Sequence, residues 1–214
     1  MKFGRLTIRH VACLGPGKKD AAVDFEAGAN AVIGLSDTGK SFVFELIDFM
    51  LGAEELKREL PEAAGYDTVV MGIETADEKL LTLRRSMSGG DMHLLDGLVM
   101  SRTGETVVET LVVTERKKGP RTINQFYLDM FGLSGMVLLA RKEKGTTQRL
   151  SIRTLSKLAL VSETRIIEQQ SPILSGQFTL ATPEMSLFKL LVSGVDDSAL
   201  ISYASETKTV EEKQ

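Results

Sequence analysis

The sequence Gly34-Leu35-Ser36-Asp37-Thr38-Gly39-Lys40-Ser41 decides the fold class. It matches the pattern G-x-x-x-x-G-K-[ST], whose glycines let the backbone curl until successive N–H groups point at phosphate oxygens. We expect Lys40 to reach the β- and γ-phosphates of a nucleotide and the Ser41 hydroxyl to coordinate Mg²⁺. The expected nucleotide-binding residues are Gly34 to Ser41 together with Phe42, which follows them directly. The other interpretation is a glycine-rich turn that binds nothing.

The flanking sequence supports the first interpretation. The short apolar run Ala31-Val32-Ile33 ends abruptly at Gly34 and is typical of a buried strand. From Lys40 to Leu51 the apolar residues predict a helix that is buried over most of its circumference and ends at Gly52. A strand before the motif and a helix after it form the context in which this pattern binds phosphate.

A complete hydrolase also needs an acidic residue for Mg²⁺ at the end of another buried strand, and a group that orients water. No apolar run in the sequence ends convincingly in Asp or Asp-Glu. The nearest substitute is Leu158-Ala159-Leu160-Val161-Ser162-Glu163, which we interpret as a strand that ends in a carboxylate. Glu163 is therefore the candidate for binding Mg²⁺ or positioning water, and a solvent-exposed strand end is the alternative.

The remaining pattern predicts a mixed α/β fold. Residues 2–9 and 22–25 predict a hairpin around the turn Gly15-Pro16-Gly17, and residues 68–113 predict an antiparallel β meander. The strands of this meander are expected at 68–74, 79–85 and 105–114, with a turn at 88–91, and helices are expected at 122–131, 151–160 and 184–191. From Asp196 to Gln214 a capped helix becomes steadily more polar.

Composition narrows the class of protein. The chain has 214 residues, 43% of them hydrophobic, but no apolar run approaches the roughly 18 to 20 residues of a membrane span. A single cysteine, Cys13, excludes an intrachain disulfide framework, and His10 and His93 have no partners at metal-binding spacing. We therefore expect a cytoplasmic protein that has no membrane-spanning segment, no membrane partner and no structural zinc site.

The order of these parts resembles the N-terminal lobe of an ABC-type ATPase head of the SMC, RecN and RecF group. The residues that carry the resemblance are the N-terminal hairpin, the lead-in from Phe25 to Asn30, the motif itself, and a helix that ends Met50-Leu51-Gly52 before a meander. The resemblance implies an ATP-binding head lobe at 1–195 and the start of a coiled coil at 196–214. It also implies ATP and Mg²⁺ as cofactors, and DNA as a partner.

Two family features are replaced in this sequence. Where the family carries a Gln that senses Mg²⁺ and the γ-phosphate, this chain reads Val161-Ser162-Glu163, which leaves Gln169 or Gln170 as alternatives. Where the family often places an Arg near the nucleotide, this chain has Ala12, which leaves Arg9, Lys18 or Lys19. The signature Ser-Gly-Gly motif, the second acidic strand motif and the switch His belong to the family's C-terminal lobe. Ser88-Gly89-Gly90 has the letters of the first of these, but we expect it to be a turn between strands, in the wrong lobe position for the signature.

The charge is distributed unevenly along the chain. Residues 116–153 hold nine basic residues and two acidic ones, so this segment carries +7 while the rest carries −10. Such an excess can neutralise phosphates without reading base sequence, or it can be a solvated surface that faces acidic groups. The candidate DNA contacts are Arg116, Lys117, Lys118, Arg121, Arg141, Lys142, Lys144 and Arg149.

The preferred hypothesis is an ATPase lobe that couples nucleotide-dependent head dimerisation to action on DNA in repair, chromosome maintenance or anti-phage defence. Its partner is a second head or a C-terminal lobe of the same family, and in a bacterium it would associate with the nucleoid. The alternative is a stand-alone nucleotide-binding interaction or regulatory module without efficient hydrolysis. A small-molecule kinase or GTPase is disfavoured because the sequence has no recognisable lid and no Asn-Lys-x-Asp base-reading element.

Overall fold

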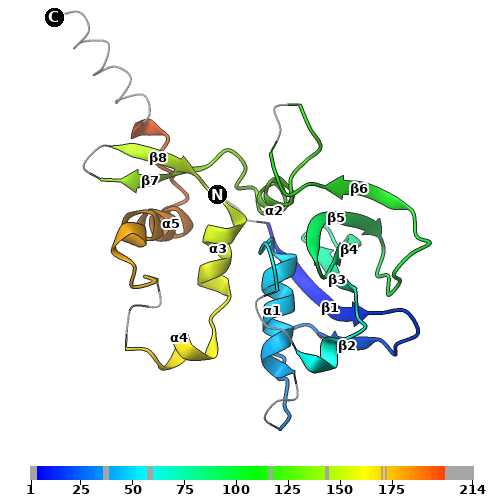
Figure 1. The fold of residues 1–214 in the computed structure, drawn as a ribbon. Helices are drawn as coiled ribbons and strands as arrows, with labels where there is room; N and C mark the ends of the chain where they lie inside the picture. The colour runs from blue at the N-terminus through cyan, green and yellow to red at the C-terminus, as the bar shows by residue number, and fades with distance from the viewer. Residues whose placement is uncertain are drawn as a thin grey trace, which may run out of the picture. The chain divides into compact units, whose positions relative to one another are not determined.

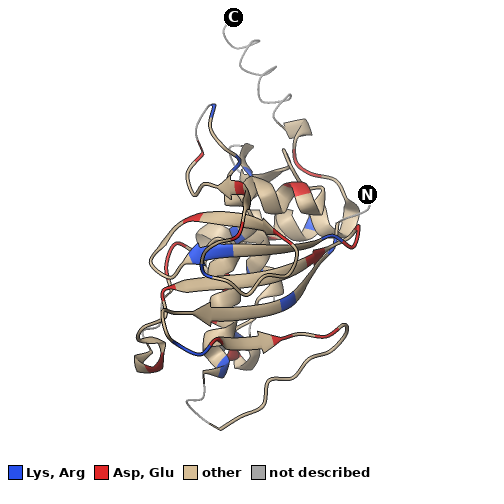
Figure 2. Ribbon diagram, turned by 90° about the vertical axis from the view of Figure 1, so that its right-hand side faces the viewer, with Lys and Arg blue, Asp and Glu red and all other residues tan. Residues whose placement is uncertain are grey.

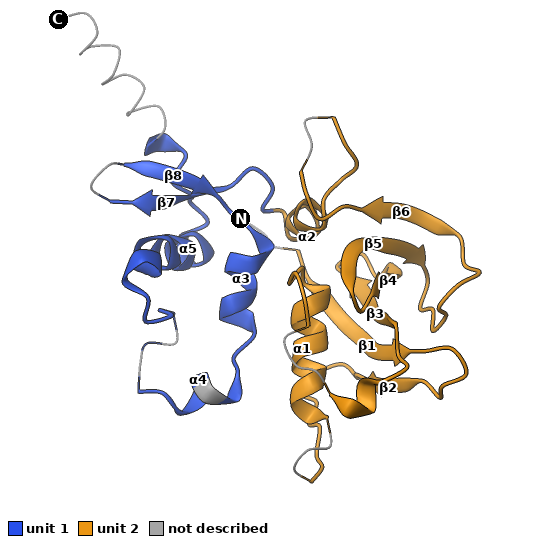
Figure 3. Cartoon of the chain, viewed as in Figure 1, with its two compact units in different colours: residues 1, 133–214 blue, residues 2–132 orange. Residues whose placement is uncertain are grey.

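The computed structural model describes residues 4–35, 39–56, 60–115, 118–142, 145–169, 171 and 173–200, without the side chain of Thr164. The chain divides into two compact units (Figures 1 and 3). The first comprises residues 2–132 and contains the predicted phosphate-binding motif. The second comprises Met1 and residues 133–214. This division cuts across the predicted lobe 1–195, which stays a prediction.

A six-stranded antiparallel sheet forms the body of the first unit, with the strand order β2-β1-β3-β4-β5-β6. The strands are β1 (Leu6–Leu14), β2 (Ala21–Asp24), β3 (Thr68–Thr75), β4 (Leu80–Ser86), β5 (Gly89–Asp96) and β6 (Val107–Leu111). The N-terminal hairpin and the antiparallel meander are confirmed. The turn expected at 88–91 is wrong, because the chain turns at Met87 and Ser88 and β5 begins at Gly89, where Gly89 and Gly90 both have positive φ.

The centre of this sheet lies at the pairing of β1 with β3. Residues 69–73 of β3 are all buried, and a register shift lies between Ile8 and His10 of β1. The His10 ring lies directly over Gly72, where an added Cβ would be 2.3 Å from His10 Cε1. Burial lowers the pKa of His10, so the ring is neutral at physiological pH and serves the packing of the sheet.

Helix α1 (Lys40–Met50) packs against β1 and β3 through Leu46, Phe49 and Met50. The predicted helix is confirmed, but it is fully buried along one side only, since its other apolar side chains are half-buried. The expected buried strand at 31–33 is wrong. Val32 is 45% and Ile33 92% exposed, and none of the described strands pairs with this segment. A strand that is buried on both faces needs neighbours, and the described part of the chain provides none for it.

Two shorter helical elements complete the first unit. The 3₁₀ helix η1 (Pro61–Ala63) precedes β3. Helix α2 (Ile123–Phe131) is confirmed and begins with a capping box, in which the Thr122 hydroxyl accepts from Gln125 N and the Gln125 side chain accepts from Thr122 N. It ends at Gly132, which adopts the left-handed conformation at φ 69°.

The second unit contains a hairpin and three α-helices among its described residues. Its elements are β7 (Val137–Arg141), β8 (Thr146–Arg149), α3 (Ile152–Ala159), α4 (Glu163–Ile167), the 3₁₀ helix η2 (Phe178–Leu180) and α5 (Ala181–Ser193). The helices expected at 151–160 and 184–191 are confirmed, although α5 begins earlier. The strand expected at 158–161 is wrong, because α3, which is capped by Ser151, continues to Ala159.

The segment after α5 is attached to the edge of β7 by hydrogen bonds. Asp196 accepts from Val137 N, and Asp197 accepts from Leu139 N and from the hydroxyl of Ser186. Lys189 pairs with the other oxygen of Asp197. Helical conformation begins again at Ala199. Residues 201–214 of the predicted coiled-coil start lie outside the described residues.

Candidate nucleotide-binding site

The predicted phosphate-binding loop connects β2 to α1 in the first unit. Gly34, Leu35 and Gly39 to Phe42 are described, whereas Ser36, Asp37 and Thr38 lie outside the described residues. Gly39 has φ 82° and ψ 6°, a left-handed conformation that favours glycine, and α1 starts at the next residue. The second glycine of the motif therefore turns the chain sharply into the helix.

The start of α1 presents backbone N–H groups that no described side chain caps. Phe42 N and Val43 N donate to Gly39 O at 3.0 and 3.2 Å, and no side-chain hydrogen bond closes this helix end in the described part of the chain. An uncapped helix N-terminus carries partial positive charge and accommodates anions. The geometry at the end of the loop can therefore serve a phosphate.

The Lys40 side chain folds back over the loop. Its Nζ donates to Gly34 O at 2.9 Å and also to Leu35 O. Both acceptors are neutral carbonyl oxygens of the loop, and these two hydrogen bonds hold the ammonium beside it. Ser41 is exposed in the first turn of α1.

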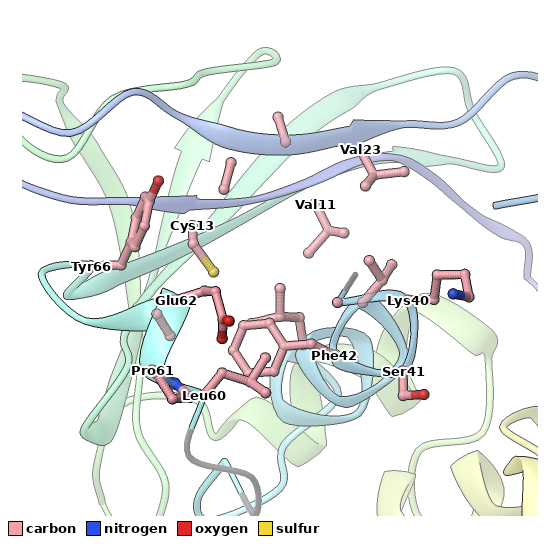
Figure 4. Close-up of a pocket in the computed structure, with 16 residues that line it drawn as sticks. Val11, Cys13, Val23, Lys40, Ser41, Phe42, Leu60, Pro61, Glu62 and Tyr66 are labelled. Carbon is pink, nitrogen blue, oxygen red and sulfur yellow. The ribbon is translucent and has the colours of Figure 1, made fainter. Parts of the chain in front are cut away.

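A pocket of about 620 Å³ extends from the start of α1 (Figure 4). Four segments of the first unit line it: β1, β2, the first turns of α1, and residues 60–66. Val11, Val23, Phe42, Val43 and Leu46 provide apolar walls, while Lys40 and Ser41 lie at one end. Its volume lies within the roughly 300–1,000 Å³ of small-molecule sites. No motif in the sequence indicates that residues 60–66, which follow α1 and turn back beside it, contribute to the site.

Two further polar groups line the pocket, the Cys13 thiol and the Tyr66 hydroxyl. Burial raises the pKa of the Cys13 thiol to about 11, so the thiol stays protonated at neutral pH. The Tyr66 hydroxyl donates to Lys19 O at 2.8 Å, which joins the 60–66 segment to the turn between β1 and β2.

The basic residues considered as replacements for a family Arg lie in different environments. Ala12 is fully buried within β1. Arg9 pairs with Glu74 at 3.7 Å, and Lys18 Nζ lies 6.0 Å from the centroid of the Tyr66 ring. Lys18 is therefore beside the Tyr66 end of the pocket, while Arg9 is engaged with β3.

Glu163 lies in the second unit, where it is the exposed first residue of α4. The preceding Ser162 caps this helix by accepting from Arg165 N at 3.4 Å. Glu163 thus begins a helix and does not end a strand. Its role toward Mg²⁺ or water stays a prediction, as does that of the exposed Gln169, and Gln170 lies outside the described residues.

The candidate DNA contacts are divided between the two units. Lys118, Arg141, Lys142 and Arg149 are exposed, whereas Arg116, Lys117 and Lys144 lie outside the described residues. Arg121 pairs with Glu109 at 2.6 Å and with Asp129 at 3.3 Å, and its guanidinium lies 5.1 Å from the Phe126 ring centroid. Figure 2 shows acidic as well as basic positions along the strands of the sheet.

The chain has a distant likeness to a known protein. A part of the chain is similar to a DNA repair protein. This part of the chain is 28% identical over 109 residues to the DNA repair protein RecN of Aquifex aeolicus (strain VF5). This stretch is 51% of the present chain and 18% of RecN, so the chain spans less than a fifth of that relative. No model of a known protein family matches the sequence.

Two further properties concern the described residues only. None of their helices has the length and apolar character that a membrane crossing requires. Nor do three or more His, Cys, Asp or Glu side chains gather there in a way that would hold a metal ion.

Proposed function

We propose that this chain is the ATP-binding lobe of an SMC-like ATPase that couples nucleotide-dependent head dimerisation to action on DNA. The observation that carries the proposal is the G-x-x-x-x-G-K-S sequence with left-handed Gly39 immediately before α1. The partial likeness to RecN supports a role in DNA repair or a related process.

Phosphate binding would use groups that the loop already holds in place. The backbone N–H groups at the uncapped N-terminus of α1 would donate hydrogen bonds to phosphate oxygens. The Lys40 ammonium, which bonds to the carbonyls of Gly34 and Leu35, would bind the β- and γ-phosphates. An ammonium binds a charged phosphate oxygen more strongly than a neutral carbonyl oxygen. Ser41 would provide a hydroxyl ligand for Mg²⁺, with Glu163 as the candidate acidic partner.

The base and sugar of ATP would enter the pocket beside α1. Phe42, Val43 and Leu46 provide apolar contacts at a short distance along the chain from Lys40. The phosphate end and the apolar end of the pocket thus follow one another along a single helix. This order matches a nucleotide, which has phosphates at one end and a base with flat apolar faces at the other.

A partner supplies what this chain lacks in the proposal. Ile33 and Leu35 are 92% and 82% exposed, an apolar approach to the loop that no described strand covers. A C-terminal lobe of the same family would cover it, and a second head would bring a signature motif to the nucleotide. Hydrolysis by the lobe alone would accordingly be slow.

The experiment measures ATP-dependent association and ATP hydrolysis by the protein and its Lys40→Ala variant. Sedimentation gives the fraction of dimer, and phosphate release gives turnover. We expect ATP·Mg²⁺ to increase the dimer fraction and DNA to stimulate turnover, with both responses lost in the variant. Unchanged turnover in the Lys40→Ala variant would contradict the assignment of the loop.

A stand-alone nucleotide-binding regulatory module is the second candidate. It is favoured by the fact that loop, helix and pocket all lie within the first unit. Tight ATP binding without association or DNA-stimulated turnover would support this alternative over the first proposal.

A further inference from the structure

The pocket beside α1 has a chemical polarity along its length. One end holds Lys40, Ser41 and the helix N-terminus, and its middle is apolar. Among the described residues that line it, Glu62 is the one carboxylate. Figure 4 shows the Glu62 side chain directed into the same cavity as the Phe42 ring and the Cys13 sulfur. A ligand that fills the pocket therefore contacts Lys40 and the positive helix N-terminus at one end, and the Glu62 carboxylate, a hydrogen-bond acceptor, on the 60–66 segment.

The backbone holds Glu62 in place. It lies within η1, with Pro61 at the helix start, Ala63 N donating to Leu60 O at 2.9 Å and Ala64 N to Pro61 O at 3.1 Å. The segment is also pressed against the turn after β1, since a Cβ added to Gly15 would lie 2.1 Å from Gly65 O. Together with the bond from the Tyr66 hydroxyl to Lys19 O, this close approach fixes the 60–66 segment beside the pocket.

The carboxylate of Glu62 is available to a ligand. Within the described part of the chain, no Lys or Arg forms a salt bridge with it and no side chain or backbone N–H donates to it. An ionised carboxylate is purely an acceptor, so the ligand must present N–H or O–H donors. Cys13 stays a thiol and the Tyr66 hydroxyl is already used, so neither competes strongly for that role.

We propose that Glu62 is a specificity-determining residue that accepts hydrogen bonds from the amino edge of a purine base. The inference rests on the proposed function, because the phosphates of the same nucleotide would occupy the loop at Lys40. The apolar walls take the flat faces of the base, and the carboxylate accepts from an exocyclic amine. Adenine offers N6–H, and guanine offers N1–H together with N2–H, so GTP competes with ATP for this site.

The experiment compares the affinities of the chain for three nucleotides by displacement of a fluorescent ATP analogue. The probes are ATP, GTP and purine riboside triphosphate, which has the same phosphates and ring system without the exocyclic amine. We expect the chain to bind ATP and GTP about 10- to 20-fold more tightly than purine riboside triphosphate, the lower end of the range of one hydrogen bond to a charged group, because the Glu62 side chain is exposed. Glu62→Ala should bring all three affinities to within about twofold, leaving that of purine riboside triphosphate unchanged.

Matched variants separate the possible failures. Glu105→Ala removes an exposed carboxylate from the same unit outside the pocket and should preserve the discrimination. Glu62→Gln keeps the size of the side chain and should lower the preference for ATP and GTP partially. Equal affinities of the unaltered chain for all three nucleotides would overturn the role of Glu62 while leaving the proposed function intact. Absence of binding to any of them, in the chain as in Lys40→Ala, would overturn both.

Discussion

The guanidinium of Arg85 lies 4.1 Å from the centroid of the Phe49 ring and donates a 2.8 Å hydrogen bond to the carbonyl oxygen of the same residue. Arg85 also donates to Ala53 O at 2.7 Å and to Gly90 O at 3.0 Å, and its side chain is almost fully buried. A cation from β4 thus satisfies carbonyls at the C-terminal end of α1, where the helix dipole is negative. The helix that starts at Lys40 is anchored at its other end by the sheet.

Replacing Arg85 by Met should lower the free energy of unfolding by about 3 kcal/mol, because three carbonyl oxygens each lose a hydrogen bond from a buried guanidinium. Urea denaturation followed by circular dichroism measures this change. The control is Arg84→Met on the same strand. The Nη1 atom of Arg84 is buried but has no hydrogen-bond partner among the described residues. We expect the control to be within about 1 kcal/mol of the unaltered chain. Equal losses in both variants would refute the anchoring role of Arg85.

Asp197 should stabilise the attachment of residues 196–200 to β7. Burial raises the pKa of Asp197, but hydrogen bonds from Lys189, Ser186 and Leu139 N outweigh this effect and the pKa is lowered overall. Asp197→Asn should cost about 2 kcal/mol near neutral pH, because the amide loses the ion pair with Lys189. Hydrogen exchange at the Val137 and Leu139 amides should become faster in the variant.

The pH dependence of this effect has a defined sign. A carboxylate whose pKa is lowered on folding contributes stability above its unfolded pKa of about 3.9 and loses it as the pH falls through the folded value. The difference between the chain and Asp197→Asn should therefore be constant from about pH 8 to 5 and shrink below about pH 4. Glu168→Gln, an exposed change in the same unit, is the matched control. A difference that grows on acidification would contradict the assignment.

Cys13 reports on occupancy of the pocket, since it is buried in the pocket wall and its pKa is raised to about 11. Because the thiolate is the reactive form, iodoacetamide should label the folded chain much more slowly at pH 8 than the urea-unfolded chain, whose thiol has its ordinary pKa of about 8.5. Saturating ATP should slow labelling further. Labelling that is unaffected by ATP would argue against a nucleotide base in this pocket.

Arg121 should contribute to stability and not to DNA affinity, because Glu109 and Asp129 already neutralise it. Arg121→Gln is expected to leave DNA affinity within about twofold, whereas Lys142→Gln should weaken it severalfold and reduce its salt dependence. Fluorescence anisotropy with labelled duplex at two salt concentrations measures both. A larger loss for Arg121→Gln than for Lys142→Gln would reverse this assignment of roles.

Sequence patterns correctly predicted the helices and strands that are determined by interactions between residues close together in the chain. The hairpin, the meander, α1 and α2 follow from alternation, turn residues and caps such as Thr122, all of which act within a few residues. Strand β5 was missed because Gly89 and Gly90 are typical of a turn, while its pairing depends on β4 and β6. Val32 and Ile33 have the composition of a buried strand, but burial requires neighbouring strands that composition does not reveal.

The candidate site shows the same division. The motif placed Lys40 and Ser41 at the start of α1, since backbone conformation at Gly39 is encoded locally. Residues 60–66 were not predicted to contribute, because their position beside α1 depends on the path of the chain into β3. Leu158 to Val161 was misassigned because a short apolar run fits a strand and a helix equally well, and the Ser151 cap favoured the helix.

The central claim is that the loop from Gly34 to Ser41 binds the phosphates of ATP. Isothermal titration calorimetry of ATP·Mg²⁺ into the chain, into Lys40→Ala and into the control Lys79→Ala, an exposed lysine of the same unit outside the pocket, tests it directly. We predict saturable binding at one site that Lys79→Ala retains and Lys40→Ala weakens by at least about tenfold, the effect of losing a charge-assisted bond to phosphate. Equal affinities of the Lys40→Ala variant and the unaltered chain would contradict the claim.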